Sequence, residues 1–219
     1  MDIKAYWDKK IIDWENSIVK RGTFSAVEKL AGYFRKPLVF RAELCLKLLA
    51  PFINGKTILE LGCGSGFFAF ELSQRGAAKK IIGIDISPNA VKRAKEINAQ
   101  RSVPAVCDFL EADASALATL PAADITIGLG FLDYLTQAEI KLIFEKNKSK
   151  YFLFTFSEKK FSLWRYVHIL YLLSQRCPKH FYYTKRQISE CIAARYGEIQ
   201  FINHRKLSFC CVVHNLPRQ

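Results

Sequence analysis

The segment that most constrains the fold spans residues 58–67 and reads I-L-E-L-G-C-G-S-G-F. It is a short apolar run followed by glycines at every second position, Gly62, Gly64 and Gly66. Glycine has no Cβ and tolerates positive φ, so a strand that enters such a loop and continues into a helix lets a ligand lie against bare backbone. The segment therefore predicts an α/β fold whose first strand leads to a site for a nucleotide-like cofactor.

Acidic residues stand at the ends of three successive predicted strands. Glu60 closes the first strand, Asp85 lies at the end of the second (residues 80–86), and Asp113 follows the third (residues 105–110). An acid at the position of Asp85 also occurs in dinucleotide-binding enzymes, but their glycine spacing is G-x-G-x-x-G rather than G-x-G-x-G. Three such acids favour adenosine attached to a cation over adenosine attached to pyrophosphate.

With these residues the chain resembles the class I S-adenosylmethionine-dependent methyltransferases. The family pattern is E/D-x-G-x-G-x-G, then an acid on the second strand, then a D-A pair, and it appears in this order within residues 57–134. The resemblance implies S-adenosylmethionine as the cofactor, with Asp85 on the ribose diol, Ile86 on the adenine face and Glu60 near the amino group. The residues expected to bind the cofactor are Glu60, Gly62, Cys63, Gly64, Ser65, Gly66, Asp85, Ile86, Asp113, Ala114, Gly130 and Phe131.

The order of predicted elements agrees with a Rossmann-like class I methyltransferase fold. From Lys56 onward strands alternate with helices, which predicts a parallel sheet, and two final strands form an antiparallel hairpin. We expect seven strands, mostly parallel with one antiparallel, and three helices in an N-terminal cap. The first expected strand ends at residue 61, and the other six span residues 80–86, 105–110, 124–129, 151–156, 199–203 and 207–213. Four expected helices span residues 3–18, 38–49, 65–74 and 88–100. Three more begin at the capping boxes Ser25-x-x-Glu28, Thr136-x-x-Glu139 and Thr184-x-x-Gln187.

The length and composition suit one domain. The chain has 219 residues, half of them apolar, which is enough for one buried core. We divide it into a helical cap (1–52), a cofactor-binding core (56–156), a helical lid insert (157–183), and a last helix with the terminal hairpin (184–219). No secretory signal and no apolar stretch of ~18 residues is present, so we expect a cytoplasmic protein without stable membrane insertion. Seven cysteines without a C-x-x-C pair predict neither zinc nor disulfides.

The loop after the fourth strand is where this fold brings the acceptor to the methyl group. Residues 128–135 read G-L-G-F-L-D-Y-L and lack the N/D-P-P-Y/F tetrapeptide of enzymes that methylate amides or exocyclic base amines. The loop resembles that of small-molecule methyltransferases. Asp133 and Tyr134 are candidates to contact acceptor or cofactor, and the alternative for Asp133 is a helix cap.

Residues 161–173, F-S-L-W-R-Y-V-H-I-L-Y-L-L, form an insert that is apolar nearly all round. We expect the N-terminal helices or the substrate to cover it, as the roof of an acceptor pocket. His168 is a candidate general base, since imidazole titrates near neutral pH, and His180 is a second candidate. The alternative for each is a structural histidine. His204 and His214 fall in the terminal hairpin, away from the expected chemistry.

The net charge of +13 is spread along the chain. Solvated helix faces explain most of it, and the excess can attract an anionic acceptor, RNA or an anionic membrane surface. Arg35 and Arg41 are candidates for binding a carboxylate. The leading hypothesis is a methyltransferase acting on a small anionic or aromatic metabolite, at oxygen rather than nitrogen. The alternatives are an RNA methyltransferase and a catalytically silent methyltransferase-like binding subunit. The oligomeric state is not predicted.

Overall fold

A computed structural model describes residues 2–19, 26–101 and 107–218, without the side chains of residues 12–35. The predicted capping box Ser25–Glu28, the first residues of the strand expected from Ala105, and the side chain of Arg35 lie outside the described residues.

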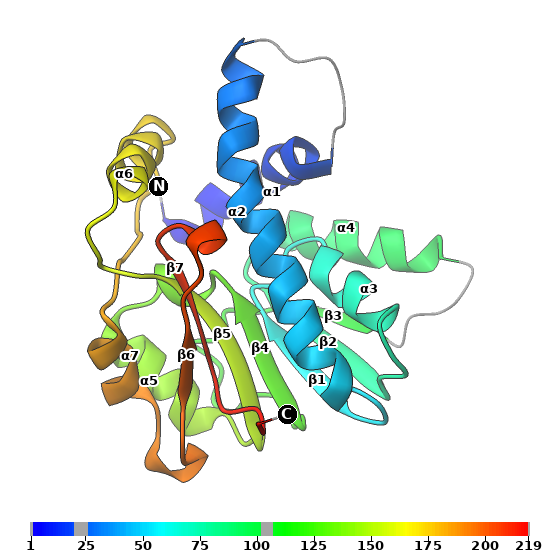
Figure 1. Cartoon of the computed structure of the whole chain (residues 1–219). Coiled ribbons are helices and arrows are strands. Elements are labelled where there is room, and N and C mark those ends of the chain that lie inside the picture. Colours follow the sequence, from blue (N-terminus) through cyan, green and yellow to red (C-terminus); the bar gives the residue numbers. More distant parts are fainter. Residues whose placement is uncertain (1, 20–25, 102–106, 219) are drawn as a thin grey trace.

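The described residues form one seven-stranded sheet (Figure 1). The order is β3-β2-β1-β4-β5-β7-β6, and β7 is antiparallel to both of its neighbours while the other pairs are parallel. The prediction of a mostly parallel seven-stranded sheet with one antiparallel strand is confirmed. Its strands are β1 (Thr57–Leu61), β2 (Lys80–Asp85), β3 (Cys107–Glu111), β4 (Ile125–Leu129), β5 (Tyr151–Ser157), β6 (Gln200–Ile202) and β7 (Cys210–His214).

The chain reverses its direction of travel across the sheet between β1 and β4. From β1 it moves outward through β2 to β3, then returns to place β4 on the other side of β1. In open α/β sheets a ligand crevice opens at such a switch point, beyond the carboxyl ends of the strands. The glycine loop after β1 and the loop after β4 therefore meet at one edge of the sheet.

Helices cover both faces of the sheet. On one face α2 (Ala26–Leu49), α3 (Phe67–Ser73) and α4 (Pro88–Ala99) contribute apolar side chains to one buried cluster. On the other face α5 (Gln137–Lys146) and α7 (Lys185–Cys191) contribute to a second. The central strands are buried on both sides, which explains why β5, Y-F-L-F-T-F-S, is a continuous run of large residues rather than an alternating one.

Three helix starts follow the predicted capping chemistry. The Ser87 hydroxyl accepts a hydrogen bond from the Ala90 amide, and Pro88 occupies the first helical position of α4. Thr136 with Glu139, and Thr184 with Gln187, form complete capping boxes at α5 and α7.

The N-terminal region contains two helices rather than the three predicted. After α1 (Ile3–Val19), α2 runs without interruption through Pro37, so the separate helix expected to begin at residue 38 is wrong. The buried side chains of Cys45, Leu46 and Leu49 anchor the second half of α2 to the sheet. Packing of this kind outweighs the local cost of a proline. Pro51 lies in the short 3-10 turn η1 (Ala50–Phe52), which ends the helix as expected.

The insert after β5 contains α6 (Leu163–Ser174), which stands apart from the sheet at the upper left of Figure 1. None of its residues is fully buried. On its outer face Leu163, Leu170 and Leu173 are exposed, so the N-terminal helices do not cover this face. Cover by the substrate, the other expected possibility, stays a prediction. Among the described residues, no helix has both the length and the apolar character that crossing a membrane requires.

Candidate active site

The glycine loop follows β1 and adopts a conformation that side chains disfavour. Gly62, Gly64 and Gly66 have φ values of +72°, +53° and +80°. A Cβ at Gly62 would lie 3.1 Å from Cδ2 of Phe131, and one at Gly66 would lie 2.7 Å from Cζ of Phe109. The loop therefore needs glycine for both torsion and space. It also lies directly against the loop after β4, through Phe131.

Asp85 joins the end of β2 to this loop. Its Oδ2 accepts a hydrogen bond from the Gly64 amide at 2.8 Å, and its Oδ1 accepts one from the Ser87 amide at 2.9 Å. Burial raises the pKa of Asp85 above its ordinary value, while the amides of Ser87, Gly64 and Ile86 oppose that shift. Each oxygen keeps a lone pair for a further donor, as a ribose diol requires.

Glu60 lies beneath the loop rather than at its surface. Its side chain is buried, and Oε2 has no hydrogen-bond partner among the described residues. Burial, together with the nearby Asp85, raises the pKa of Glu60 to about 8, against the opposing hydrogen bond from the Ala69 amide. A positive charge placed beside the Glu60 carboxyl group would favour its ionised form and so lower its pKa again.

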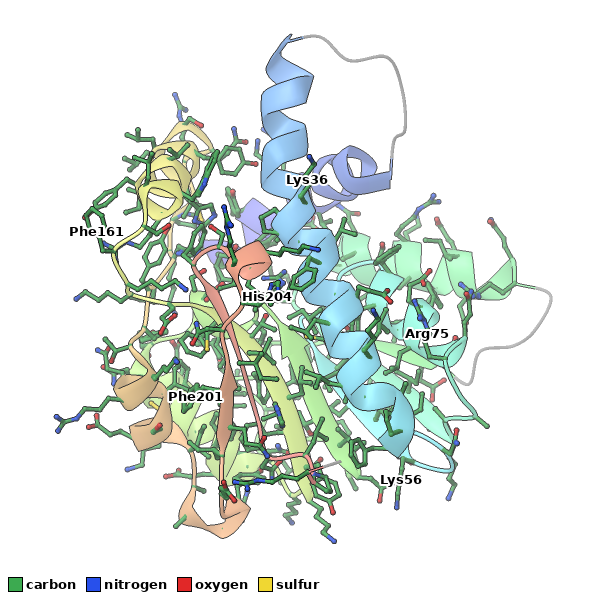
Figure 2. All side chains as sticks on the ribbon, in the orientation of Figure 1. Lys36, Lys56, Arg75, Phe161, Phe201 and His204 are labelled. Carbon is green, nitrogen blue, oxygen red and sulfur yellow. The ribbon has the colours of Figure 1, made fainter. Side chains whose placement is uncertain are left out.

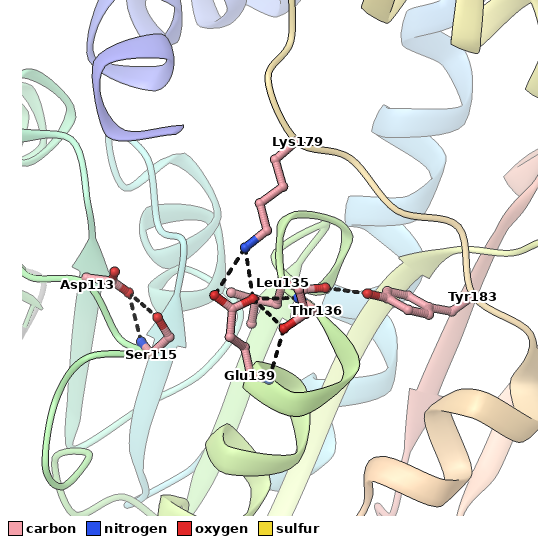
Figure 3. A network of polar contacts seen from close by, with 7 residues as sticks. All are labelled: Asp113, Ser115, Leu135, Thr136, Glu139, Lys179 and Tyr183. Atoms are coloured by element: carbon pink, nitrogen blue, oxygen red, sulfur yellow. Dashed lines mark hydrogen bonds and ion pairs between the residues drawn. The ribbon is translucent and has the colours of Figure 1, made fainter. Parts of the chain in front are cut away.

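A hollow of about 340 Å³ opens beside the ends of β2 and β3. One of the Asp113 oxygens, Oδ1, accepts hydrogen bonds from the amide and hydroxyl of Ser115, as Figure 3 shows. The Ala114 side chain is buried in the core, so its backbone is what can face a ligand. The hollow is lined by Asp2, Ile3, Lys4, Ile86, Glu111, Ala112 and Asp113.

The start of α1 closes this hollow from above. Asp8 accepts hydrogen bonds from the Ser87 hydroxyl and from the amide and side chain of Asn89, each at 2.9 Å. Lys4 pairs with Glu111 at 2.8 Å. These contacts hold α1 against the start of α4 and the end of β3. No motif indicates these contacts, because they join segments about eighty to a hundred residues apart.

The loop after β4 brings the predicted acceptor residues next to Arg41. The Gly130 amide donates to Oγ1 of Thr155 at 2.8 Å, and a Cβ at Gly130 would lie 3.2 Å from Nη1 of Arg41. Arg41 itself is buried, and its Nε has no hydrogen-bond partner among the described residues. The guanidinium is thus a buried cation beside the expected acceptor path.

Asp133 is a buried anchor within the 3-10 turn η2 (Leu132–Tyr134). Its carboxylate accepts hydrogen bonds from the Ser157 amide at 2.6 Å and the Ser157 hydroxyl at 3.0 Å, and its carbonyl accepts one from the Phe181 amide. Burial raises its pKa to about 7, although Ser157 and Arg41 pull the pKa down. The helix-cap alternative is wrong, because Thr136 caps α5.

His180 lies against this anchor. Its Nε2 is 3.9 Å from Oδ2 of Asp133, both side chains are buried, and its Nδ1 has no hydrogen-bond partner among the described residues. The ring of Tyr134 meets it edge-on with 5.5 Å between ring centres, and Trp7 of α1 packs edge-on against the other side of Tyr134 at 5.2 Å. Burial, together with the neighbouring His168, lowers the pKa of His180 to about 3.

His168 reaches the same cluster from α6. The centres of the two imidazole rings are 5.1 Å apart, and Nδ1 of His168 is hydrogen-bonded to the Tyr182 hydroxyl at 2.7 Å. Burial lowers the pKa of His168 to about 4, assisted by the charge of Arg41. Both histidines are therefore neutral at pH 7, and burial makes each a weaker base than a free imidazole.

The chain between α6 and α7 is pinned to the start of α5, which fixes the position of His180. Figure 3 shows Lys179 paired with Glu139, at 2.8 Å to Oε2, and the Tyr183 hydroxyl donating to the carbonyl of Leu135. Sequence analysis does not identify Ser157 and Tyr182 as site residues, since neither belongs to a motif. The only available signals are that Ser157 ends a strand and that Tyr182 is two positions from His180.

The seven cysteines are free thiols, and six of them are buried. Within the described ranges, no group of three or more His, Cys, Asp or Glu side chains is arranged to hold a metal ion.

Comparison with known proteins relates the middle of the chain to a family of domains. Residues 53–153 match a family model described as a methyltransferase domain. The chain is 48% identical over 61 residues to the ribosomal protein L11 methyltransferase of Klebsiella pneumoniae subsp. pneumoniae, a stretch covering 27% of this chain and 20% of that relative. The chain thus spans about a fifth of the length of that curated relative.

Two solved structures share the fold over most of the chain. Magnesium protoporphyrin IX methyltransferase from Synechocystis PCC 6803 with bound SAH superposes with a TM-score of 0.72 at 16% identity, covering 97% of this chain and 96% of that one. Human N-acetylserotonin methyltransferase in complex with SAM gives a TM-score of 0.59 at 21% identity, covering 87% of this chain and 56% of that one.

The sheet order and the glycine loop at its switch point define a protein of the class I methyltransferase fold. Residues 53–153 match a methyltransferase domain, and the chain has the fold of the class I methyltransferases that use S-adenosylmethionine. The residues present fit that molecule, because the glycine loop, the Asp85 carboxylate and the orphaned Oε2 of Glu60 together offer a backbone cradle, a diol acceptor and a partner for a cation.

Proposed function

We propose that this chain transfers a methyl group from S-adenosylmethionine to an oxygen, in preference to a nitrogen, of a small anionic or aromatic metabolite. The observation that supports this is the convergence of Arg41, Asp133, His168 and His180 beside the loop that touches the glycine turn. Arg41 suits an anionic group on the acceptor. The rings of Tyr134 and Tyr182 suit an aromatic one.

The cofactor would be held by the residues that the family pattern implies. The backbone of residues 62–66 would lie along its tail and ribose, Asp85 would take the diol, and Ile86 with Asp113 would face the adenine in the hollow beside β2 and β3. Glu60 would act on the amino group from beneath the loop. S-adenosylmethionine supplies a methyl group on a sulfonium, whose in-line transfer needs alignment in a dry pocket more than it needs strong charges.

His180 is the best candidate for the general base. A hydroxyl acceptor must lose its proton as it is methylated, and the unpartnered Nδ1 of His180 offers a place for it. Burial lowers the pKa of His180 and so opposes this role, which therefore depends on Asp133 stabilising the charged ring. Asp133, close to the other ring nitrogen, would stabilise the imidazolium that forms. Ser157 would keep Asp133 in place, which makes Asp133 and Ser157 positioning residues.

A labelled-methyl assay tests this proposal against its alternatives. The protein is incubated with methyl-labelled S-adenosylmethionine and separate small-molecule, RNA and protein fractions of a cell extract. We expect label in the small-molecule fraction, and a loss of ~10²-fold or more in His180→Ala with cofactor affinity retained. The control is His204→Ala, an exposed histidine stacked on Phe40. Label in RNA alone would establish the RNA alternative, and cofactor binding without label in any fraction would establish the silent subunit.

A further inference from the structure

Large apolar side chains are exposed along α6 and just before it. Phe161 is 90% exposed, and Leu163, Leu170 and Leu173 are 73%, 66% and 68% exposed. Figure 2 places Phe161 at the outer edge of the molecule. The three leucines follow one another at spacings of seven and three residues, so they share one face of the helix. A continuous apolar face of this kind marks an interaction site.

The length of α6 limits what it can do in a membrane. Its 12 residues span ~18 Å at ~1.5 Å per residue, which is far less than the ~30 Å thickness of a hydrocarbon core. Such a helix cannot cross a bilayer, but it can lie within the headgroup region with its apolar face turned toward the acyl chains.

The charge around α6 has a single sign. Between residues 159 and 189 the chain carries no aspartate or glutamate. Three basic residues of this stretch pair with carboxylates outside it, namely Lys160 with Glu158, Lys179 with Glu139 and Arg186 with Glu190. Of the other four, Arg165 lies within α6 over the ring of Tyr166 and Lys185 begins α7, while the exposed Lys159 and Arg176 stand before and after the apolar segment. The seven basic residues are Lys159, Lys160, Arg165, Arg176, Lys179, Lys185 and Arg186.

We propose that α6 and Phe161 form a docking surface for an anionic lipid bilayer. Lipid fits these observations better than a protein partner does, because the helix projects from the fold (Figure 1) and its ends carry cations that complement anionic headgroups. A fluid bilayer also accepts exposed leucines without a shaped receptor. The inference concerns binding alone and does not depend on which group is methylated.

Vesicle sedimentation tests the surface directly. Purified protein is mixed with vesicles of phosphatidylglycerol and phosphatidylcholine, or of phosphatidylcholine alone, at low salt and at ~0.5 M salt, where charges are screened within a few ångströms. We expect sedimentation with the anionic vesicles, weakened by salt, and little with the neutral ones. Lys159→Gln with Arg176→Gln should reduce binding to the anionic vesicles only.

A matched pair of double variants separates the docking face from general hydrophobicity. Leu163→Ser with Leu170→Ser should lower the vesicle partition coefficient by at least ~10-fold, since two leucines no longer enter the apolar layer. The control, Leu110→Ser with Leu142→Ser, removes two exposed leucines from β3 and α5 and should bind as the unchanged protein does. Circular dichroism verifies that each variant is folded.

Several results would overturn the proposal. These are no sedimentation with anionic vesicles, equal binding by the Leu163/Leu170 variant, or equal binding to neutral and anionic vesicles. A fourth contradicting result would come from light scattering. If the unchanged protein is a dimer and the Leu163/Leu170 variant is a monomer, a second copy of the chain occupies this face.

Discussion

The Oδ2 atom of Asp85 accepts a hydrogen bond of 2.8 Å from the backbone amide of Gly64, which ties the end of β2 to the glycine loop of β1. The side chain expected to bind the ribose therefore also holds the loop in shape before the cofactor arrives. A site organised in advance loses less conformational entropy on binding. We therefore expect Asp85 to act on cofactor affinity in two ways.

Replacing Asp85 should weaken cofactor binding. Asp85→Ala removes hydrogen bonds to a charged group, and we expect affinity for S-adenosylhomocysteine to fall by ~1.5–3 kcal/mol in titration calorimetry. The control is Asp108→Ala on the neighbouring strand, whose exposed carboxylate pairs with Lys80. Unchanged affinity in Asp85→Ala would remove the ribose assignment.

The third glycine of the loop should tolerate no side chain. Gly66→Ala combines a φ of +80° with a Cβ placed 2.7 Å from Phe109, and should lower the free energy of unfolding by ~2–4 kcal/mol. Gly55→Ala is the matched control, because Gly55 has a φ of +68° but nothing within 4 Å of its added Cβ. Denaturant titration measures both, and equal losses would show that the contact with Phe109 has no effect.

The buried Glu60 should make stability fall with rising pH. Its pKa is about 8 in the folded protein against an ordinary value of 4.5, so within this window the folded state keeps a proton that the unfolded chain releases. The contribution to the free energy of unfolding is fully present below pH 4.5 and is lost as pH rises toward 8, by ~1 kcal/mol per pH unit.

Denaturant titrations between pH 7 and 8 lie above the ordinary pKa of histidine, 6.5, but still contain contributions from Asp133 and from buried cysteines such as Cys45, whose pKa values are raised as well. The comparison with a variant of Glu60 therefore separates its contribution from theirs. Glu60→Gln cannot ionise and should flatten the decline. Glu96→Gln, an exposed glutamate of α4, should leave the slope as it is. A slope in Glu60→Gln equal to that of the unchanged protein would contradict the pKa shift.

Asp8 should hold α1 over the cofactor hollow. Asp8→Ala removes the three acceptor contacts to Ser87 and Asn89, and we expect amide hydrogen exchange within Ile3–Val19 to accelerate by ~10-fold or more. Lys9→Ala changes an exposed neighbour on the same helix and serves as the control. If both variants exchange at the original rate, α1 is held by other contacts.

The parts of the fold that sequence predicts well depend on short-range chemistry. The glycine loop, the strands around it and the starts of α4, α5 and α7 each follow from residues within a few positions of one another. The continuity of α2 through Pro37 does not, because it depends on contacts between Leu46 or Leu49 and strands far away in the chain.

Some residues of the candidate site can likewise be predicted from the sequence, and others cannot. Asp85 was predicted from its place at a strand end, and its contact with the glycine loop agrees with that place. The hydrogen bond from Ser157 to Asp133 and the one between Tyr182 and His168 join residues whose spacing carries no motif. The fully apolar character of α6 was visible, but the exposure of its outer face depends on where the N-terminal helices go.

The two histidines of the cluster lie side by side, but different parts of the fold hold them in place. His180 precedes Phe181, whose amide is bound to the carbonyl of Asp133, so it moves with the sheet. His168 is carried by α6 and meets the sheet only through side-chain contacts such as those with Phe209 and Tyr182. A displacement of α6 would therefore move His168 away and leave His180 in place near the glycine loop. A large acceptor could then enter without displacing His180, the group proposed to accept the proton.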